Sequence, residues 1–158
     1  MTPNELLLER LQQKKPQRLL CLGPELPPAV STFQIDTTNR PIAVSECPDI
    51  QRAPEETFDL VLVSQQLEQL PKSEGKTLIG RLRHLFAPSV WVCYQQDDQS
   101  EWQDTDFYSL GMTKEATIQS ADSAFVLYAF DLLTYNHVRS WNNANHWANP
   151  QNWGKYWW

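Results

Sequence analysis

Residues Thr57–Tyr94 read TFDLVLVSQQLEQLPKSEGKTLIGRLRHLFAPSVWVCY, and this stretch decides the fold. It opens with a short run of mostly apolar, branched side chains at 58–64, which is typical of a strand buried on both faces. An amphipathic segment follows, whose apolar side chains have helical spacing along one stripe: Leu78, Ile79, Leu82, Leu85 and Phe86. Ala87 and Pro88 end this segment, and residues 90–94 form a second buried strand. A strand, a helix and a strand with short joints predict a parallel crossover unit of an α/β protein.

The same stretch resembles the fourth motif of class I S-adenosylmethionine-dependent methyltransferases, which runs Phe-Asp-apolar-Val and then Leu-Glu-His-Leu-Pro. Gln69 stands where that family often has His, and residues 18–23 lie where its first strand and glycine-rich turn would be. The resemblance spans roughly residues 18–133, and the whole chain resembles an uncharacterised bacterial group of methyltransferase-like proteins. The matching positions of the motif are Asp59, Leu67, Glu68, Leu70 and Pro71.

The resemblance implies an α/β fold with a doubly wound, mostly parallel sheet. The segment between the first strand and Thr57 is short for such a fold, and both 32–36 and 42–45 are candidate strands. Parallel neighbours need a crossover of about a dozen residues. The front half of the sheet is therefore either reduced, or one of these segments pairs antiparallel.

Capping signals predict two further helices. Residues 2–5, Thr-Pro-Asn-Glu, form a capping box that opens a first helix with Leu7 and Leu11 on one face. A second capping box at 100–103 predicts a helix that ends at Gly111. Beyond it, 115–120 and 124–133 are expected to form an antiparallel hairpin, which the resemblance also implies.

The turn after the first strand departs from the methyltransferase pattern. The family carries Asp/Glu-x-Gly-x-Gly-x-Gly there, whereas residues 21–27 read CLGPELP and keep only Gly23. Pro24 and Pro27 fix φ and remove two backbone donors, while Glu25 adds a carboxylate. We therefore expect that S-adenosylmethionine binding has been lost or altered.

The resemblance also implies an acid at the end of the second strand that binds the ribose hydroxyls of the cofactor. Asp36 and Glu46 both qualify, and either is equally explained as a solvated turn residue. Asp59 either organises the cofactor cleft or satisfies nearby backbone donors. Together with Gly23 and Ser64, these are the candidate cofactor-binding residues.

The substrate side of the predicted site is less defined. Gln65 and Glu68 follow the carboxyl end of a parallel strand, the edge where open α/β sheets bind ligands. Nothing in their chemistry specifies a reaction, so catalytic residues stay unassigned.

Composition narrows the classes further. A chain of 158 residues corresponds to about one domain. Its three cysteines are scattered without metal-ligand spacing, so we expect no metal and a cytoplasmic protein. A net charge of -6 disfavours nucleic acid as a general partner. No apolar run approaches membrane length, so we expect no membrane association.

The last residues, 136–158, form a tail distinct from the α/β domain at 1–135. The tail is rich in Trp and Asn and contains no acidic residue. So much indole surface is expected to pack on the domain or on a second subunit, which would make the protein a homodimer. The alternative is a surface that stacks on bases or sugars.

The sequence thus leads to three hypotheses for the function. The first is a methyltransferase-like protein with a degenerate cofactor loop, non-catalytic or with an altered ligand, that acts by self-association or by binding an unidentified protein or small molecule. The second is an active S-adenosylmethionine-dependent methyltransferase of small molecules, which would rely on proximity rather than on acid-base residues. The third is nucleic-acid or glycan binding by the tail.

Overall fold

The structure is a computed structural model that describes residues 1–36, 43–47, 57–85, 87–135 and 144–155. The backbone alone is described for residues 43–47 and 85.

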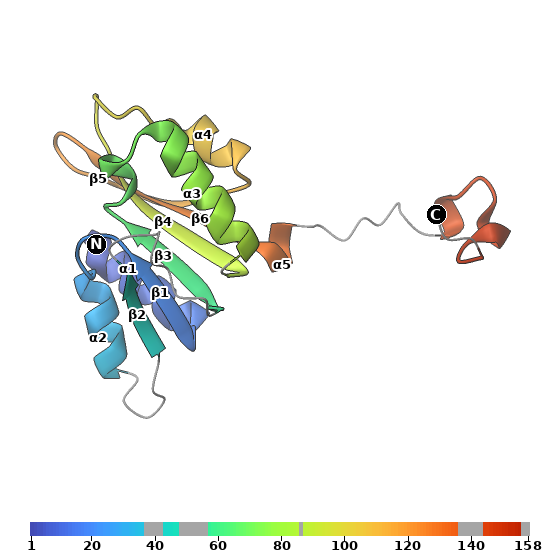
Figure 1. Cartoon of the computed structure of the whole chain (residues 1–158), viewed down its shortest axis with the longest axis horizontal. Coiled ribbons are helices and arrows are strands. Elements are labelled where there is room, and N and C mark those ends of the chain that lie inside the picture. The colour runs from blue at the N-terminus through green and yellow to red at the C-terminus, as the bar shows by residue number, and fades with distance from the viewer. Residues whose placement is uncertain (37–42, 48–56, 86, 136–143, 156–158) are drawn as a thin grey trace.

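The described strands form one six-stranded sheet in the order β2-β1-β3-β4-β6-β5 (Figure 1). Four neighbouring strands run parallel, and β6 pairs antiparallel with both β4 and β5. The α/β class and the mostly parallel sheet predicted from the sequence are therefore confirmed. The strand bounds are β1 Arg18–Leu22, β2 Ala43–Cys47, β3 Leu60–Ser64, β4 Ser89–Gln96, β5 Thr113–Gln119 and β6 Ala124–Asp131.

Helices cover both faces of the sheet, and alternate strand residues show which helices lie on which face. Leu19 and Cys21 of β1 pack with α1 (Pro3–Lys14) and α2 (Pro28–Asp36). Leu20 and Leu22 of the same strand pack with α3 (Lys72–Leu85) and α4 (Asp104–Ser109). This alternation follows from the period of two along a strand, and it places two apolar cores on opposite faces.

The first helix and the crossover helix follow the signals in the sequence. Thr2 and Glu5 form the expected reciprocal capping box at the start of α1, and Leu7 and Leu11 are buried. Leu78, Ile79 and Leu82 of α3 are buried against the sheet. Short elements complete the domain: the 3-10 helix η2 (Leu67–Gln69) and the helix α5 (Leu132–Tyr135).

Residues 32–36, a candidate strand, are helical instead. They are the second half of α2, which begins at Pro28 and buries Ala29, Val30 and Phe33. Proline at the first helical position and the i, i+1, i+4 spacing of these side chains explain the helix, because the spacing lets one face of it cover the sheet. The second strand is β2, which pairs parallel with β1, so neither candidate segment pairs antiparallel.

Two boundaries predicted in the carboxyl-terminal half of the chain are also wrong. The helix expected from Ser100 begins at Asp104, because the capping box is formed by Gln103 and Asp106, whose Oδ2 accepts from the Gln103 amide at 2.9 Å. Gly111 follows this helix with φ of +79°, as a residue after a helix end often does. Leu133 lies in α5 and not in the last strand.

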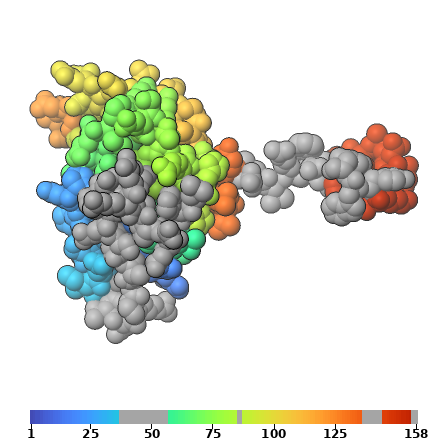
Figure 2. All heavy atoms as spheres, viewed as in Figure 1, coloured from blue at the N-terminus to red at the C-terminus, as the bar shows by residue number. Residues whose placement is uncertain are grey.

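In the tail, the structure describes residues 144–155. They contain two 3-10 helices, η3 (Ala144–His146) and η4 (Pro150–Asn152), with the Trp147 and Trp153 rings in edge contact at 4.8 Å between centroids. Figures 1 and 2 show this unit apart from the α/β domain. Packing of the tail on the domain or on a second subunit therefore stays a prediction.

Candidate functional site

The sheet has a topological switch point at β1. The chain passes from β1 to β2 on one side and later returns to β3 on the other side. In open parallel sheets, ligands bind in the crevice outside the carboxyl ends of the strands at such a point. Gly23 and Ser64 lie there, because Leu22 is paired with Val63 in the register of β1 and β3.

Gly23 is in close contact with the end of β3. A Cβ on Gly23 would lie 2.0 Å from the carbonyl oxygen of Ser64, and the φ of Gly23 is +143°. Glycine is required here both by the backbone conformation and by the lack of space. The two strand ends therefore approach each other more closely than any other residue type would allow.

The turn that follows Gly23 has few backbone donors. Pro24, Pro27 and Pro28 carry no N–H, and the Val30 amide donates to the Pro27 carbonyl at 2.9 Å. Glu25 is exposed to solvent.

Just beyond β3 the backbone adopts an unusual conformation. Gln65 has φ of +57°, one of two non-glycine residues with positive φ in the described part of the chain. Such conformations cost free energy and often occur at functional sites. They also turn the chain sharply, and here the turn leads into η2, which carries Glu68.

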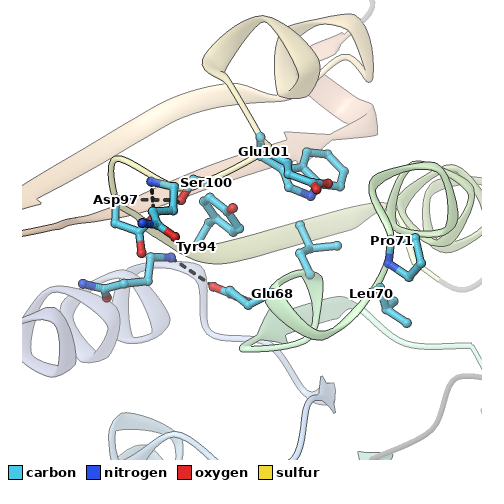
Figure 3. Close-up of a pocket in the computed structure, with 11 residues that line it drawn as sticks. Glu68, Leu70, Pro71, Tyr94, Asp97, Ser100 and Glu101 are labelled. Carbon is cyan, nitrogen blue, oxygen red and sulfur yellow. Dashed lines mark hydrogen bonds between the residues drawn. The ribbon is translucent and has the colours of Figure 1, made fainter.

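A cleft of about 340 Å³ opens next to η2 (Figure 3). Glu68 lies at its centre, and Glu68 Oε1 accepts from the Gln95 amide of β4 at 3.1 Å. The cleft thus joins the carboxyl ends of β3 and β4 with the loop that precedes α4. Its lining residues are Leu67, Glu68, Leu70, Pro71, Tyr94, Gln95, Asp97, Gln99, Ser100, Glu101 and Trp102.

The loop after β4 is held in place by its own polar groups. Asp97 Oδ1 accepts from the Gln99 amide and from the Ser100 hydroxyl, both at 2.9 Å, and Ser100 Oγ accepts from the Asp97 amide at 2.9 Å. Tyr94 beneath the loop is buried, and burial raises the pKa of its phenol while a hydrogen bond with Ser100 lowers it in part. These contacts make the polar wall of the cleft an ordered structure.

The predicted site residues divide into two groups. Gly23, Ser64, Gln65 and Glu68 lie along the carboxyl edge of the sheet. The backbone of Glu46 is near that edge too, because Glu46 of β2 is paired with Cys21 in the register of β1.

The other two candidate acids lie elsewhere. Asp59 precedes β3 at the opposite, amino edge, where its Oδ2 accepts from the amides of Gln17 at 2.9 Å and Arg18 at 3.1 Å. Asp59 thus satisfies backbone donors at the start of β1, which is the second of the two roles predicted for it. Asp36 ends α2, and the crossover helix runs back toward the amino edge. Asp36 is exposed and accepts from Gln12 Nε2 at 3.5 Å.

The sequence did not lead us to predict the part of the cleft that is formed by the residues at the end of β4 and after it. The signal that was present is the polar run at 95–101 directly after a buried strand. Because parallel β3 and β4 end at the same edge, this run had to lie beside the residues that follow β3.

One protein family matches the chain over its whole length. A family model described as "Family of unknown function (DUF6231)" matches residues 1–158. The chain belongs to this family. No curated protein sequence matches the chain significantly.

Solved structures show the fold to be that of S-adenosylmethionine-dependent methyltransferases, at low sequence identity. Magnesium protoporphyrin IX methyltransferase (ChlM) from Synechocystis PCC 6803 with bound SAM has a TM-score of 0.53 and 10% identity, covering 81% of this chain and 77% of that one. The N-terminal domain of EvdMO1 with SAH bound has a TM-score of 0.54 and 10% identity, with 83% and 81% covered. The N-methyltransferase NodS from Bradyrhizobium japonicum WM9, in complex with SAH, has a TM-score of 0.50 and 20% identity, with 82% and 88% covered. The predicted resemblance to class I methyltransferases is confirmed at the level of the fold.

Two further findings concern metals and membranes. Within the described residues, no group of three or more His, Cys, Asp or Glu side chains is arranged to hold a metal ion. Nor does this part of the chain contain a helix of the length and apolarity needed to span a bilayer.

Proposed function

We propose that this protein is a ligand-binding protein with a methyltransferase fold that has lost methyl transfer. It acts through a ligand other than S-adenosylmethionine, or through a protein partner that can be a second copy of the chain. The observation that carries this proposal is the conformation and composition of the turn after β1.

S-adenosylmethionine fits this turn poorly. In the family pattern, bare glycine backbone approaches the cofactor; here only Gly23 remains, and Glu25 and Pro27 stand at the positions of the next two glycines. The three prolines that follow remove donors and present rings instead of free backbone. Glu25 adds a negative charge near where the carboxylate of the cofactor would bind in a methyltransferase. Each of these features disfavours the cofactor.

The position of the cleft supports the same proposal. Its lining comes from η2, the end of β4 and the loop before α4, and none of residues 22–28 contributes to it. A ligand in this cleft would therefore lie beside the usual cofactor position and not in it. The polar residues that would bind a ligand come from the end of β4 and from the segments that follow β3 and β4, and not from the proline-containing turn after β1.

Isothermal titration calorimetry of the full chain tests the proposal. We expect no saturable binding of S-adenosylmethionine or S-adenosylhomocysteine, while circular dichroism shows that the same sample is folded. Low-micromolar binding of either compound would contradict the loss of the cofactor site.

A second candidate, an active S-adenosylmethionine-dependent methyltransferase of small molecules, is favoured by Glu46. This acid is on the second strand, one residue before its carboxyl end and in register with Cys21, where the family resemblance implies a ribose-binding carboxylate. If the cofactor binds, Glu46→Ala should lower the affinity for it by about tenfold or more, since the bidentate hydrogen bonds to the ribose would be lost. A substitution of Gly23 is unsuitable for this test, because any side chain there would meet the Ser64 carbonyl.

A further inference from the structure

The cleft beside η2 has a marked chemical asymmetry. Three carboxylates line it, those of Glu68, Asp97 and Glu101, and among the described residues no Lys, Arg or His side chain does. Its volume of about 340 Å³ is within the usual range of small-molecule sites, about 300–1,000 Å³. The lining therefore favours a ligand of positive charge.

Two lysines of the adjacent helix form ion pairs with Asp106, which does not line the cleft. Lys72, which follows the lining residue Pro71, lies 2.7 Å from Asp106 Oδ2, and its ammonium group also donates to the Glu101 carbonyl at 3.0 Å. Lys76 lies 3.1 Å from Asp106 Oδ1. Asp106 thus pairs with both lysines, and neither of them neutralises the cleft carboxylates through an ion pair in the described residues.

The protein itself orients two of these carboxylates through one oxygen each. Glu68 uses Oε1 to accept from the Gln95 amide, and Asp97 uses Oδ1 to accept from Gln99 and Ser100. Within the described part of the chain, neither Glu68 Oε2 nor Asp97 Oδ2 has a hydrogen-bond partner. These oxygens can accept from a ligand without breaking the bonds that hold the side chains.

The other side of the cleft is apolar. Leu70 and Pro71 lie across from Asp97 and Ser100, with Glu68 between the two sides (Figure 3). Leu67 and Trp102 add further apolar atoms to the lining. A ligand that fills the cleft would therefore contact carboxylates at one end and hydrocarbon at the other.

We infer that the cleft binds a small organic cation, an amine or guanidine with an apolar body. Its charged group lies against Glu68 and Asp97, and its body lies against Leu70 and Pro71. The net charge of -6 also attracts cations to the protein in general. This inference rests on the proposed function and deepens it, because it specifies the chemical class of the ligand through which the protein acts.

The test is a titration of the full chain, measured by calorimetry or by NMR, with each of three cations: butylamine, 2-phenylethylamine and agmatine. We expect at least one of them to bind saturably at concentrations up to about 10 mM. The matched probe is 2-phenylethanol, which has the same body as 2-phenylethylamine without the charge. We expect the amine to bind at least about tenfold more tightly than the alcohol.

Variants then locate the site. Glu68→Gln and Asp97→Asn should each lower the affinity for the amine by about tenfold, since each removes a charge that would contact the amine. Asp98→Asn and Glu74→Gln remove the same charge from exposed positions outside the lining, and they should leave the affinity unchanged. Urea unfolding of each variant shows whether it is folded, and the side-chain amide introduced by Glu68→Gln would retain an acceptor for the Gln95 N–H.

Three results would overturn the inference: failure of all three cations to bind, equal binding of the amine and the alcohol, or an equal effect of Asp98→Asn and Asp97→Asn. None of these results would alter the calorimetric test with S-adenosylmethionine. That test alone decides the proposed loss of the cofactor, so failure of the ligand class and failure of the proposed function can be told apart.

Discussion

The carbonyl oxygen of Ser64 occupies the space in which a side chain of Gly23 would begin, 2.0 Å from the ideal Cβ position. The contact joins the carboxyl ends of β1 and β3 at the switch point of the sheet. It also makes Gly23 a residue on which the stability of the domain depends.

Gly23→Ala should destabilise the protein by about 3 kcal/mol or more, since it combines a steric clash with a φ of +143°. Urea unfolding measures this change. The matched control is Gly80→Ala in α3, where a Cβ would meet nothing within 4 Å. That variant should be more stable than the wild type by about 0.5–1 kcal/mol, because alanine is the better helix former. Equal effects of the two substitutions would contradict the Gly23–Ser64 contact.

Acid should weaken the domain through Asp106. Hydrogen bonds from Lys72, the Gln103 amide and Lys76 lower the pKa of Asp106 from 3.8 to about 2. Because the unfolded chain takes up this proton at a higher pH than the folded one, the stabilisation is complete above about pH 4 and is lost as the pH falls toward 2.

Unfolding free energies measured between these pH values check this expectation. Asp106→Asn should be less stable than the wild type at neutral pH and should show a smaller loss of stability in acid. The control is Asp98→Asn, an exposed loop position, which should keep the acid dependence of the wild type. An unchanged acid dependence in Asp106→Asn would refute the role of this carboxylate.

Tyr128→Phe should cost about 1.5–3 kcal/mol of stability, because the buried hydroxyl donates to the charged Asp104 Oδ1 at 2.5 Å. The phenylalanine ring would keep the stacking of Tyr128 on Phe107, so the change isolates the hydrogen bond. Tyr108→Phe is the control. Because Tyr108 is 48% exposed, this substitution should change the free energy of unfolding by no more than about 0.5 kcal/mol. Thermal or urea unfolding measures both; equal stabilities of the two variants would contradict the hydrogen bond.

Deletion of residues 136–158 should leave a folded domain. Among the described residues, both apolar cores end at Phe130, and no described tail residue belongs to either. A cooperative unfolding transition of the shortened chain is the expected result, and loss of that transition would show that the tail packs on the domain. Light scattering of both chains tests the expected homodimer: it should be present with the tail and absent without it.

Local patterns were reliable where the responsible residues are close in the chain. The Thr2–Glu5 capping box and the stripe from Leu78 to Leu82 predicted α1 and α3, because caps and periodicity act within a few residues. The run from Leu60 to Val63 predicted a buried strand for the same reason. Residues 32–36 were ambiguous, because a short run of mixed apolar and polar side chains suits either a strand or a helix. Burial of Phe33 against the sheet resolves this ambiguity in favour of α2.

The amino-acid sequence by itself determined the crossover unit, the glycine at the end of β1 and the prolines that follow it. Only the tertiary structure decided that Asp59 binds the amides that begin β1, that Ser64 lies against Gly23, and that Glu68 and Asp97 line one cleft. The physical reason is that helix and strand signals come from covalent neighbours, whereas a site depends on the register of strands. That register, which brings Glu68 within 3.1 Å of the Gln95 amide, is set by packing across the whole sheet.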